Sequence, residues 1–328
     1  MPGIFTISLD YELHWGVFDK RDRDARKVNY KNTLEIVPKL LQDFSKNGIH
    51  VTWATVGALF ASGEAEFNHL KPLGSLQPNY QNQQLSAYKY IEKNGLDKEF
   101  DWAHFSPGSV KSISNYEGQE LGTHTFAHYY CLEPGQKIEQ FAADIDSAIK
   151  AAVMIGKKMV SLVFPRNQFN EAYLKVCFDK GIKVVRSNPD QWFWSGTTDE
   201  NTSLVRKLFR TGDTYIALGK NTSYPLNSLK ITQGEPLQLP ASRFLRPYHP
   251  KYKFLNAMRL KRILSEMETA AKRNECYHLW WHPENFGDYP GESLKDLNVI
   301  IEKYRTLQKK YGMISWNMKE YAQHFNLL

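Results

Sequence analysis

Residues 118–128 read GQELGTHTFAH, and the architecture of the chain can be worked out from this stretch. Its first half has the pattern of a short strand, and His124 and His128 follow it directly. On a helical turn, side chains four residues apart share a face, so both imidazoles could reach one metal ion. The stretch therefore predicts a strand that ends in a pair of metal ligands. The alternative is that both histidines are ordinary surface or core residues.

Predicted strands and helices alternate on both sides of this stretch. Before it, apolar runs at 4–9 and 49–56 enclose a helix over 32–47 that contains Pro38. After it, strands are predicted over 160–164, 182–185, 276–281 and 314–316, and helices over 136–155, 170–180, 255–274, 293–311 and 318–325. Strands that alternate with helices are typical of a parallel sheet covered by helices.

Two longer stretches interrupt the alternation. Residues 63–107 and 187–255 are polar or rich in proline and glycine, and we interpret both as loop-rich insertions. Neither has the character of a separate domain, so we expect a single domain over residues 1–328. Where strands and helices of this kind close into a (β/α) barrel, the catalytic residues lie on the loops that follow the strands.

The overall composition is that of a soluble globular protein. Of 328 residues, 42% are hydrophobic and 23% are charged, and no apolar run approaches the ~20 residues that span a bilayer. The first residues are strand-like and do not resemble a signal peptide. The three cysteines form no C-x-x-C pair, as expected of reduced thiols in the cytoplasm.

The net charge of +7 mildly favours anionic partners such as nucleotide sugars or lipid phosphates. Lysine and arginine are scattered without a basic run, which argues against a nucleic-acid partner.

Two carboxylates, Asp10 and Glu12, follow the strand predicted over 4–9. They are two residues apart, so both project from the same face if the strand continues. A hydrolytic metal site needs an acidic ligand beside its histidines and one open position. Either carboxylate could bind the metal while the other serves as a base. The alternative is that Glu12 faces solvent and Asp10 caps a helix.

Three more residues lie at predicted strand ends. His282, in HLWWHPE, could be a general acid, and Arg166 could orient a carboxylate. Asp190 could hold His282 in the required tautomer. The alternatives are a packed core histidine, a surface ion pair and a turn aspartate.

Taken in order, these motifs resemble the polysaccharide deacetylase family, carbohydrate esterase family four. Its five motifs correspond to residues 8–12, 124–128, 165–166, 190–192 and 279–282. The His-Thr-x-x-His and Leu-x-x-His motifs are matched in full. The family's metal-binding aspartate is replaced by Tyr11, which leaves Glu12 or Asp10 as the ligand. The Asp-x-Glu variant resembles a divergent branch that also contains cyclic-amide and formamide hydrolases.

The resemblance implies a distorted (β/α) barrel with about seven parallel strands and one divalent metal ion. Zinc is the first choice, and cobalt, nickel or iron suit the same ligands. The implied reaction is removal of an N-acetyl group from a sugar. In it, Asp10 oriented by Arg166 is the base, and His282 held by Asp190 is the acid. The remaining implied substrate contacts are Leu279 at the acetyl group and Trp15 and Trp192 at the sugar faces.

The segment 228–250 carries Arg243 and Arg246, which could grip a phosphate. The alternative is that both arginines pair with local acids. Without an export signal, we expect the substrate to be a soluble nucleotide- or lipid-linked sugar of surface-polysaccharide biosynthesis. Two alternatives are a hydrolase of small cyclic amides or formamides and a catalytically silent sugar-binding barrel.

Overall fold

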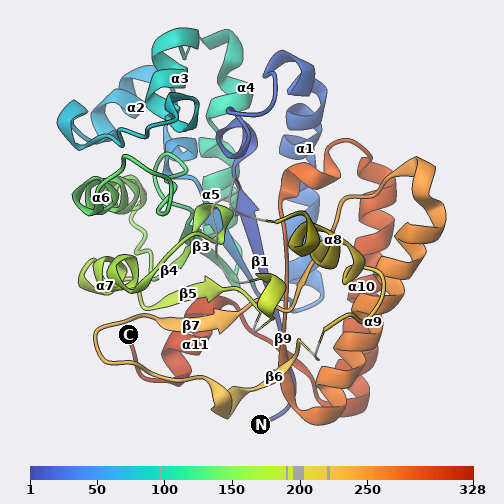
Figure 1. The fold of residues 1–328 in the computed structure, drawn as a ribbon. Helices are drawn as coiled ribbons and strands as arrows, with labels where there is room; N and C mark the ends of the chain where they lie inside the picture. Colours follow the sequence, from blue (N-terminus) through green and yellow to red (C-terminus); the bar gives the residue numbers. More distant parts are fainter. Residues whose placement is uncertain (97, 190, 195–202, 220–221) are drawn as a thin grey trace.

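A curled sheet of mostly parallel strands forms the centre of the molecule (Figure 1). The computed structural model describes residues 1–96, 98–189, 191–194, 203–219 and 222–328. The strands run in the spatial order β6-β9-β1-β2-β3-β4-β5-β7. Their bounds are β1 (Ile4–Tyr11), β2 (Val51–Thr55), β3 (Gln119–Thr123), β4 (Ser161–Val163), β5 (Val184–Ser187), β6 (Tyr224–Pro225), β7 (Leu237–Pro240), β8 (Arg243–Phe244), β9 (Glu275–Trp281) and β10 (Ile314–Ser315).

The segment that contains β7 and β8 joins the two ends of the sheet. β7 pairs in parallel with β5, and β8 pairs in parallel with β9. Between them, the backbone N–H of Ser242 donates to the carbonyl of His278 at 2.8 Å. The expected distorted (β/α) barrel is therefore confirmed. The interpretation of 187–255 as loop-rich decoration is wrong, because these strands lie within it and are too short to give a clear hydrophobic pattern.

Helices surround the sheet. Their bounds are α1 (Lys27–Lys46), α2 (Glu64–Leu70), α3 (Ala87–Asn94), α4 (Asp101–His104), α5 (Pro107–Asn115), α6 (Ile138–Met154), α7 (Glu171–Asp179), α8 (Leu204–Gly212), α9 (Lys253–Arg273), α10 (Pro290–Tyr311) and α11 (Met318–His324). Pro38 lies inside α1. Within the described ranges, every helix is too short or too polar to traverse a lipid bilayer.

The stretch 63–107 is largely helical, which corrects the expectation of an irregular insertion. It contains α2, α3, α4 and the first residue of α5. These helices gather at the top of the view in Figure 1, far from the N-terminus at the bottom. Phe67 of α2 is fully buried and stacks on Trp15 and Phe126. Helices of only four to eight residues give too few turns for a periodic pattern, so tertiary contacts of this kind decide them.

The two faces of β1 have different surroundings. Phe5, Ile7 and Leu9 belong to the main apolar core. Ser8 and Asp10, on the other face, contact side chains of strands across the barrel interior. Because side chains alternate along a strand, Glu12 continues the interior face. Toward the end of β1 the interior face is therefore polar, whereas Ile4 at its start belongs to a separate apolar cluster.

Candidate active site

The histidine loop that follows β3 is not a helical turn. Thr125 and His128 have φ angles of +65° and +56°, in the left-handed region. Asp144 of α6 is fully buried and accepts hydrogen bonds from the backbone N–H groups of Phe126 (2.5 Å) and Ala127 (3.2 Å). The carboxylate of Asp144 thus pairs with two backbone N–H groups of the loop that would otherwise pair within a helix. The prediction that the two histidines lie on a helical turn is therefore wrong, but their side chains still converge.

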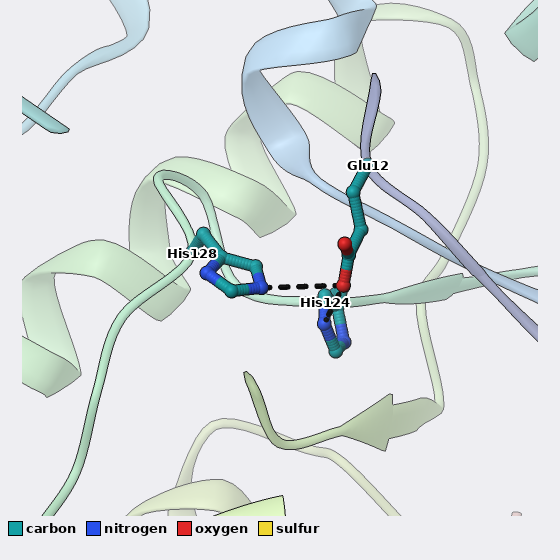
Figure 2. A group of neighbouring side chains, drawn as sticks. All are labelled: Glu12, His124 and His128. Atoms are coloured by element: carbon teal, nitrogen blue, oxygen red, sulfur yellow. Dashed lines mark hydrogen bonds and ion pairs between the residues drawn. The ribbon is translucent and has the colours of Figure 1, made fainter. Parts of the chain in front are cut away.

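Glu12, His124 and His128 point toward one another (Figure 2). Glu12 Oε1 lies 2.8 Å from Nε2 of His124 and 3.2 Å from Nε2 of His128. The opposite ring nitrogens have partners: Nδ1 of His124 lies 2.7 Å from the carbonyl of Val163, and Nδ1 of His128 lies 3.0 Å from the hydroxyl of Tyr130. These partners leave both Nε2 atoms facing the carboxylate.

The three side chains fit a divalent metal ion. Two imidazole nitrogens and one carboxylate oxygen, all within 4.8 Å of one another, are the donor set of a hydrolytic zinc site with an open position. Nε2 of His124 is buried, and its approach to Glu12 lacks the geometry of a hydrogen bond. Burial lowers the pKa of His128 and so favours the neutral imidazole that binds metals. Of the two carboxylates, Glu12 is the one that lies beside both histidines.

Gly16 leaves the space in which the Glu12 carboxylate lies. A Cβ atom at Gly16 would be 1.6 Å from Oε2 and 2.5 Å from Cδ of Glu12. We expect Gly16→Ala to turn that carboxylate away and to weaken zinc binding by about 10–100-fold, the range typical of disturbed supporting contacts. A competitive zinc titration measures this, with Gly108→Ala as the matched control because its Cβ meets nothing within 4 Å. Equal affinities in the two variants would contradict the prediction.

Asp10 is held by Arg186, not by Arg166. Both guanidinium nitrogens of Arg186 donate to it, Nη1 to Oδ1 at 2.6 Å and Nη2 to Oδ2 at 2.7 Å. Burial raises the pKa of Asp10, but the charge and hydrogen bonds of Arg186, together with the nearby His124 and His282, outweigh burial and the net pKa is lowered. Arg166 instead pairs with Asp19 at 2.5 Å and lies over the ring of Tyr130.

The expectation that Arg166 orients Asp10 is therefore corrected. Arg166 lies in a turn after β4 with a φ of +53°, whereas Arg186 is on β5 and reaches across the barrel interior. The signal for Arg186 was present in the sequence, since it is an arginine within the otherwise apolar strand VVRS. A buried arginine requires a buried anion.

His282 lies beside both carboxylates, directly after β9. Its Nε2 is 3.8 Å from Oδ2 of Asp10 and 3.6 Å from Oε1 of Glu12. Its side chain is 28% exposed, in contrast to the buried carboxylates, so it can meet a substrate. Asp190, its expected partner, lies outside the described residues.

Glu284 supports the backbone of the site and was missed in the sequence. It accepts hydrogen bonds from the backbone N–H groups of Glu12 (3.0 Å) and Leu13, and its Oε2 is buried without a partner in the described part of the chain. Burial, and then the negative charge of Glu12, raises the pKa of Glu284 to about 8. Its place two residues after His282 was the available signal.

This shift predicts how stability changes with pH in protein stripped of metal. The pKa of Glu284 is about 8 in the folded state against an ordinary 4.5, so its contribution to stability is complete below 4.5 and is lost as pH rises through about 8. Glutamine stays neutral, and Glu284→Gln should therefore lose less stability than wild type between about pH 5 and pH 9. Urea unfolding across this range measures the difference. If the free energy of unfolding changes with pH in the same way in both proteins, Glu284 is ionised across this whole pH range and the prediction is wrong.

A cavity of about 500 Å³ opens beside these groups. Its walls include Asp10, Glu12, His128 and His282. Its lining also includes aromatic side chains and cations: Tyr30, Phe244, Trp280, Arg21, Arg26 and Arg166. Trp280, and not the expected Trp15 or Trp192, is thus the tryptophan that lines this cavity.

Several residues expected at the substrate do not reach the cavity. Trp15 is fully buried, and its Nε1 donates to the carbonyl of His104 at 2.8 Å. Leu279 is also fully buried in the apolar core, on the opposite face of β9 from His282. Trp192 is 54% exposed, packs on Phe209 and is not among the residues that line the cavity. The expectation for Trp15 and Leu279 is therefore wrong.

Arg243 is not available to grip a phosphate. It is 6% exposed, and its guanidinium pairs with Glu266 at 2.5 Å and with Asp213 at 2.7 Å. Arg246 lies beside it, with Nε donating to the hydroxyl of Thr214 at 2.9 Å. The predicted clamp is corrected for Arg243, whose charge is matched by Glu266 of α9 and by Asp213, which follows α8.

Comparisons with solved structures support the fold. A protein described as a polysaccharide deacetylase from Mycobacterium smegmatis superposes with a TM-score of 0.61 and 12% identity, over 100% of this chain and 92% of that one. Another from Pseudomonas aeruginosa PAO1 gives 0.59 and 10%, over 99% and 91%. The PuuE allantoinase gives 0.54 and 8%, over 99% and 90%.

Comparisons of sequence give a different result. No protein-family model and no curated protein matches the chain. At identities this low, structural likeness establishes the fold alone. Together with the strand order described above, it shows that this chain has the distorted (β/α) barrel of the polysaccharide deacetylases.

Proposed function

We propose that this chain is a metal-dependent hydrolase that removes an N-acetyl group from a sugar or sugar conjugate, in surface-polysaccharide biosynthesis. The observation that carries the proposal is the convergence of Glu12, His124 and His128 with Asp10 and His282 beside one cavity. A metal site, an ionised base and a partly exposed histidine are together the components of amide hydrolysis.

Glu12, His124 and His128 would hold the metal ion, with zinc as the first choice and cobalt, nickel or iron suited to the same donors. When bound, the ion supplies Lewis acidity, which polarises an acyl oxygen and makes water a stronger acid. Gly16 and the partners of the two imidazoles fix the direction of the ligands before the ion arrives.

Asp10 is the proposed general base. Arg186 keeps it ionised and fixes both of its oxygens, so that Oδ2 accepts the proton of the attacking water. Nε2 of His282 gives a proton to the departing nitrogen. The C–O bond forms, the C–N bond breaks, and the products are acetate and a free amine. In this proposal Arg186 takes the positioning role that the sequence assigned to Arg166.

A screen by mass spectrometry tests the proposal. Metal-loaded protein is incubated with acetylated nucleotide sugars, simple N-acetylated sugars, free ureides and formamides, and the released acid is identified. Acetate from an acetylated sugar supports the proposal. No acetate from any acetylated compound, with the metal shown to be bound, would overturn it.

A second candidate is hydrolysis of a small cyclic amide. The likeness to an allantoinase, at a TM-score of 0.54, favours it, because the barrel of that protein superposes over nearly all of this chain. In the same screen this candidate predicts turnover of ureides and none of acetylated sugars. A catalytically silent barrel would bind sugar without turning over any compound.

A further inference from the structure

A second cavity, of about 720 Å³, is larger than the one at the candidate active site. It lies between the segment 63–107 and the first turn of α6, and we call it the insertion cavity. Neither the proposed catalytic residues nor the metal ligands line it. It therefore has no role in the chemistry described above.

The walls of the insertion cavity are fixed by contacts between its two sides. Gln140 of α6 is buried; its Nε2 donates to the carbonyl of Gln77 at 2.8 Å, and its Oε1 accepts from the backbone N–H of Lys137 at 2.8 Å. The backbones also touch, because a Cβ at Gly135 would lie 2.5 Å from the carbonyl oxygen of Asn79. A cavity held this way is preformed for a ligand.

The lining is polar, with an excess of positive charge. Apart from Gln140, whose amide holds the two walls together, amides and small hydroxyls are the largest group: Gln77, Asn79, Gln83, Ser75 and Ser86. Such groups both donate and accept, as sugar hydroxyls require. The cations are Lys71, Lys89 and Lys137, against one acid, Glu92. Glu92 is paired with Lys89 at 2.7 Å, and Lys71 donates to the amide oxygen of Asn68. The lining, which consists of described residues, therefore holds two positive charges without an acid of its own to match them.

The insertion cavity and the candidate active site are neighbours of the same intermediate cavity. Arg21 lines both the active-site cavity and this intermediate cavity, which has a volume of about 480 Å³. Gln83 and Lys89 line both the intermediate cavity and the insertion cavity. The three cavities therefore lie next to one another in a row.

We propose that the insertion cavity binds an acidic segment of a glycan whose acetylated sugar lies beside His282. The inference rests on the proposed function and specifies its substrate class as an oligosaccharide that carries carboxylate or phosphate groups. Lys71 and Lys137 select the negative charge, and the amides and hydroxyls bind the sugar hydroxyls.

Calorimetric binding to the full chain tests this with two probes, an acidic hyaluronan octasaccharide and neutral N-acetylchitohexaose. Wild type should bind the acidic probe about tenfold more tightly, as expected for two charge-assisted contacts on partly solvated lysines. Lys71→Gln combined with Lys137→Gln should remove this preference. Gly74→Trp should fill the cavity and weaken binding of both probes, because nothing lies within 4 Å of a Cβ there.

Gly108→Trp is the matched control, since Gly108 has equally open surroundings and does not line the cavity. Equal binding by wild type and Gly74→Trp, or no binding of the acidic probe by wild type, would overturn the inference. Acetate release from a single acetylated sugar, too short to reach the insertion cavity, is measured separately. If Gly74→Trp loses binding but neither wild type nor any variant releases acetate, the insertion cavity is confirmed as a glycan-binding site and the proposed deacetylation is rejected.

Discussion

His124→Ala is expected to abolish stoichiometric metal binding and to lower kcat/KM for an acetylated sugar by about 10³-fold. The loss follows from the several kcal/mol that a Lewis acid contributes to the transition state. His124 offers a buried Nε2 at 2.8 Å from Glu12, and its Nδ1 is already committed to the carbonyl of Val163. Alanine removes this donor and leaves only two of the three ligands.

Elemental analysis of the purified proteins measures the metal directly. His50→Ala is the control, because His50 is a histidine outside the site that pairs with Glu320 at 2.8 Å. It should keep a full complement of metal. His128→Ala should behave like His124→Ala, and the double variant should be hardly worse, since the ligands act as a unit. Equal metal in wild type and His124→Ala would show that the three side chains are not the metal site.

His282→Ala is expected to lower kcat by roughly 10²–10⁴-fold, the range for a positioned proton donor. Metal content and folding should be unchanged, because His282 is partly exposed and is not one of the three proposed ligands. Its Nε2 lies 3.6–3.8 Å from the two carboxylates, close enough to deliver a proton to a nitrogen leaving from between them.

The leaving group distinguishes proton transfer from a structural role. An amine must be protonated to leave, whereas an alcohol with a low pKa leaves with little help. His282→Ala should therefore slow hydrolysis of an acetamide far more than hydrolysis of an activated acetate ester. An equal loss on both substrates would show that His282 positions the site and does not donate the proton.

The residues at the ends of the strands could be predicted from the sequence, because their positions depend on patterns within a few neighbouring residues. Asp10 lies near the end of a strand with clear alternation, Glu12 follows that strand, and His282 follows another, so parallel pairing alone brings them to one end of the barrel. His124 follows a third strand, which begins after Gly118 and contains Gly122. Each of these positions depends on a strand period of two and on the rule that parallel strands end together.

Other parts of the site depend on which side chains meet across the barrel. The sequence analysis named Arg166 as the partner of Asp10, and only the direction of β5 into the interior shows that Arg186 takes this place. Arg243 reads as a phosphate ligand until Glu266 and Asp213 are found against it. Buried charges are matched by partners that are far away in the sequence, so spacing does not reveal them.

The sequence by itself determined the alternation of strands and helices and the strand ends at which chemistry is placed, because these follow from periodicity over a few residues. The barrel class was implied by the resemblance of the motifs to a known family. Only the tertiary structure decided that Glu12 faces the two histidines, that Arg186 holds Asp10 and that β7 and β8 complete the sheet. It also decided that 63–107 folds into helices around a polar cavity. The physical reason is that ion pairs and short elements obtain their stability from partners distant in the chain, which no local pattern records.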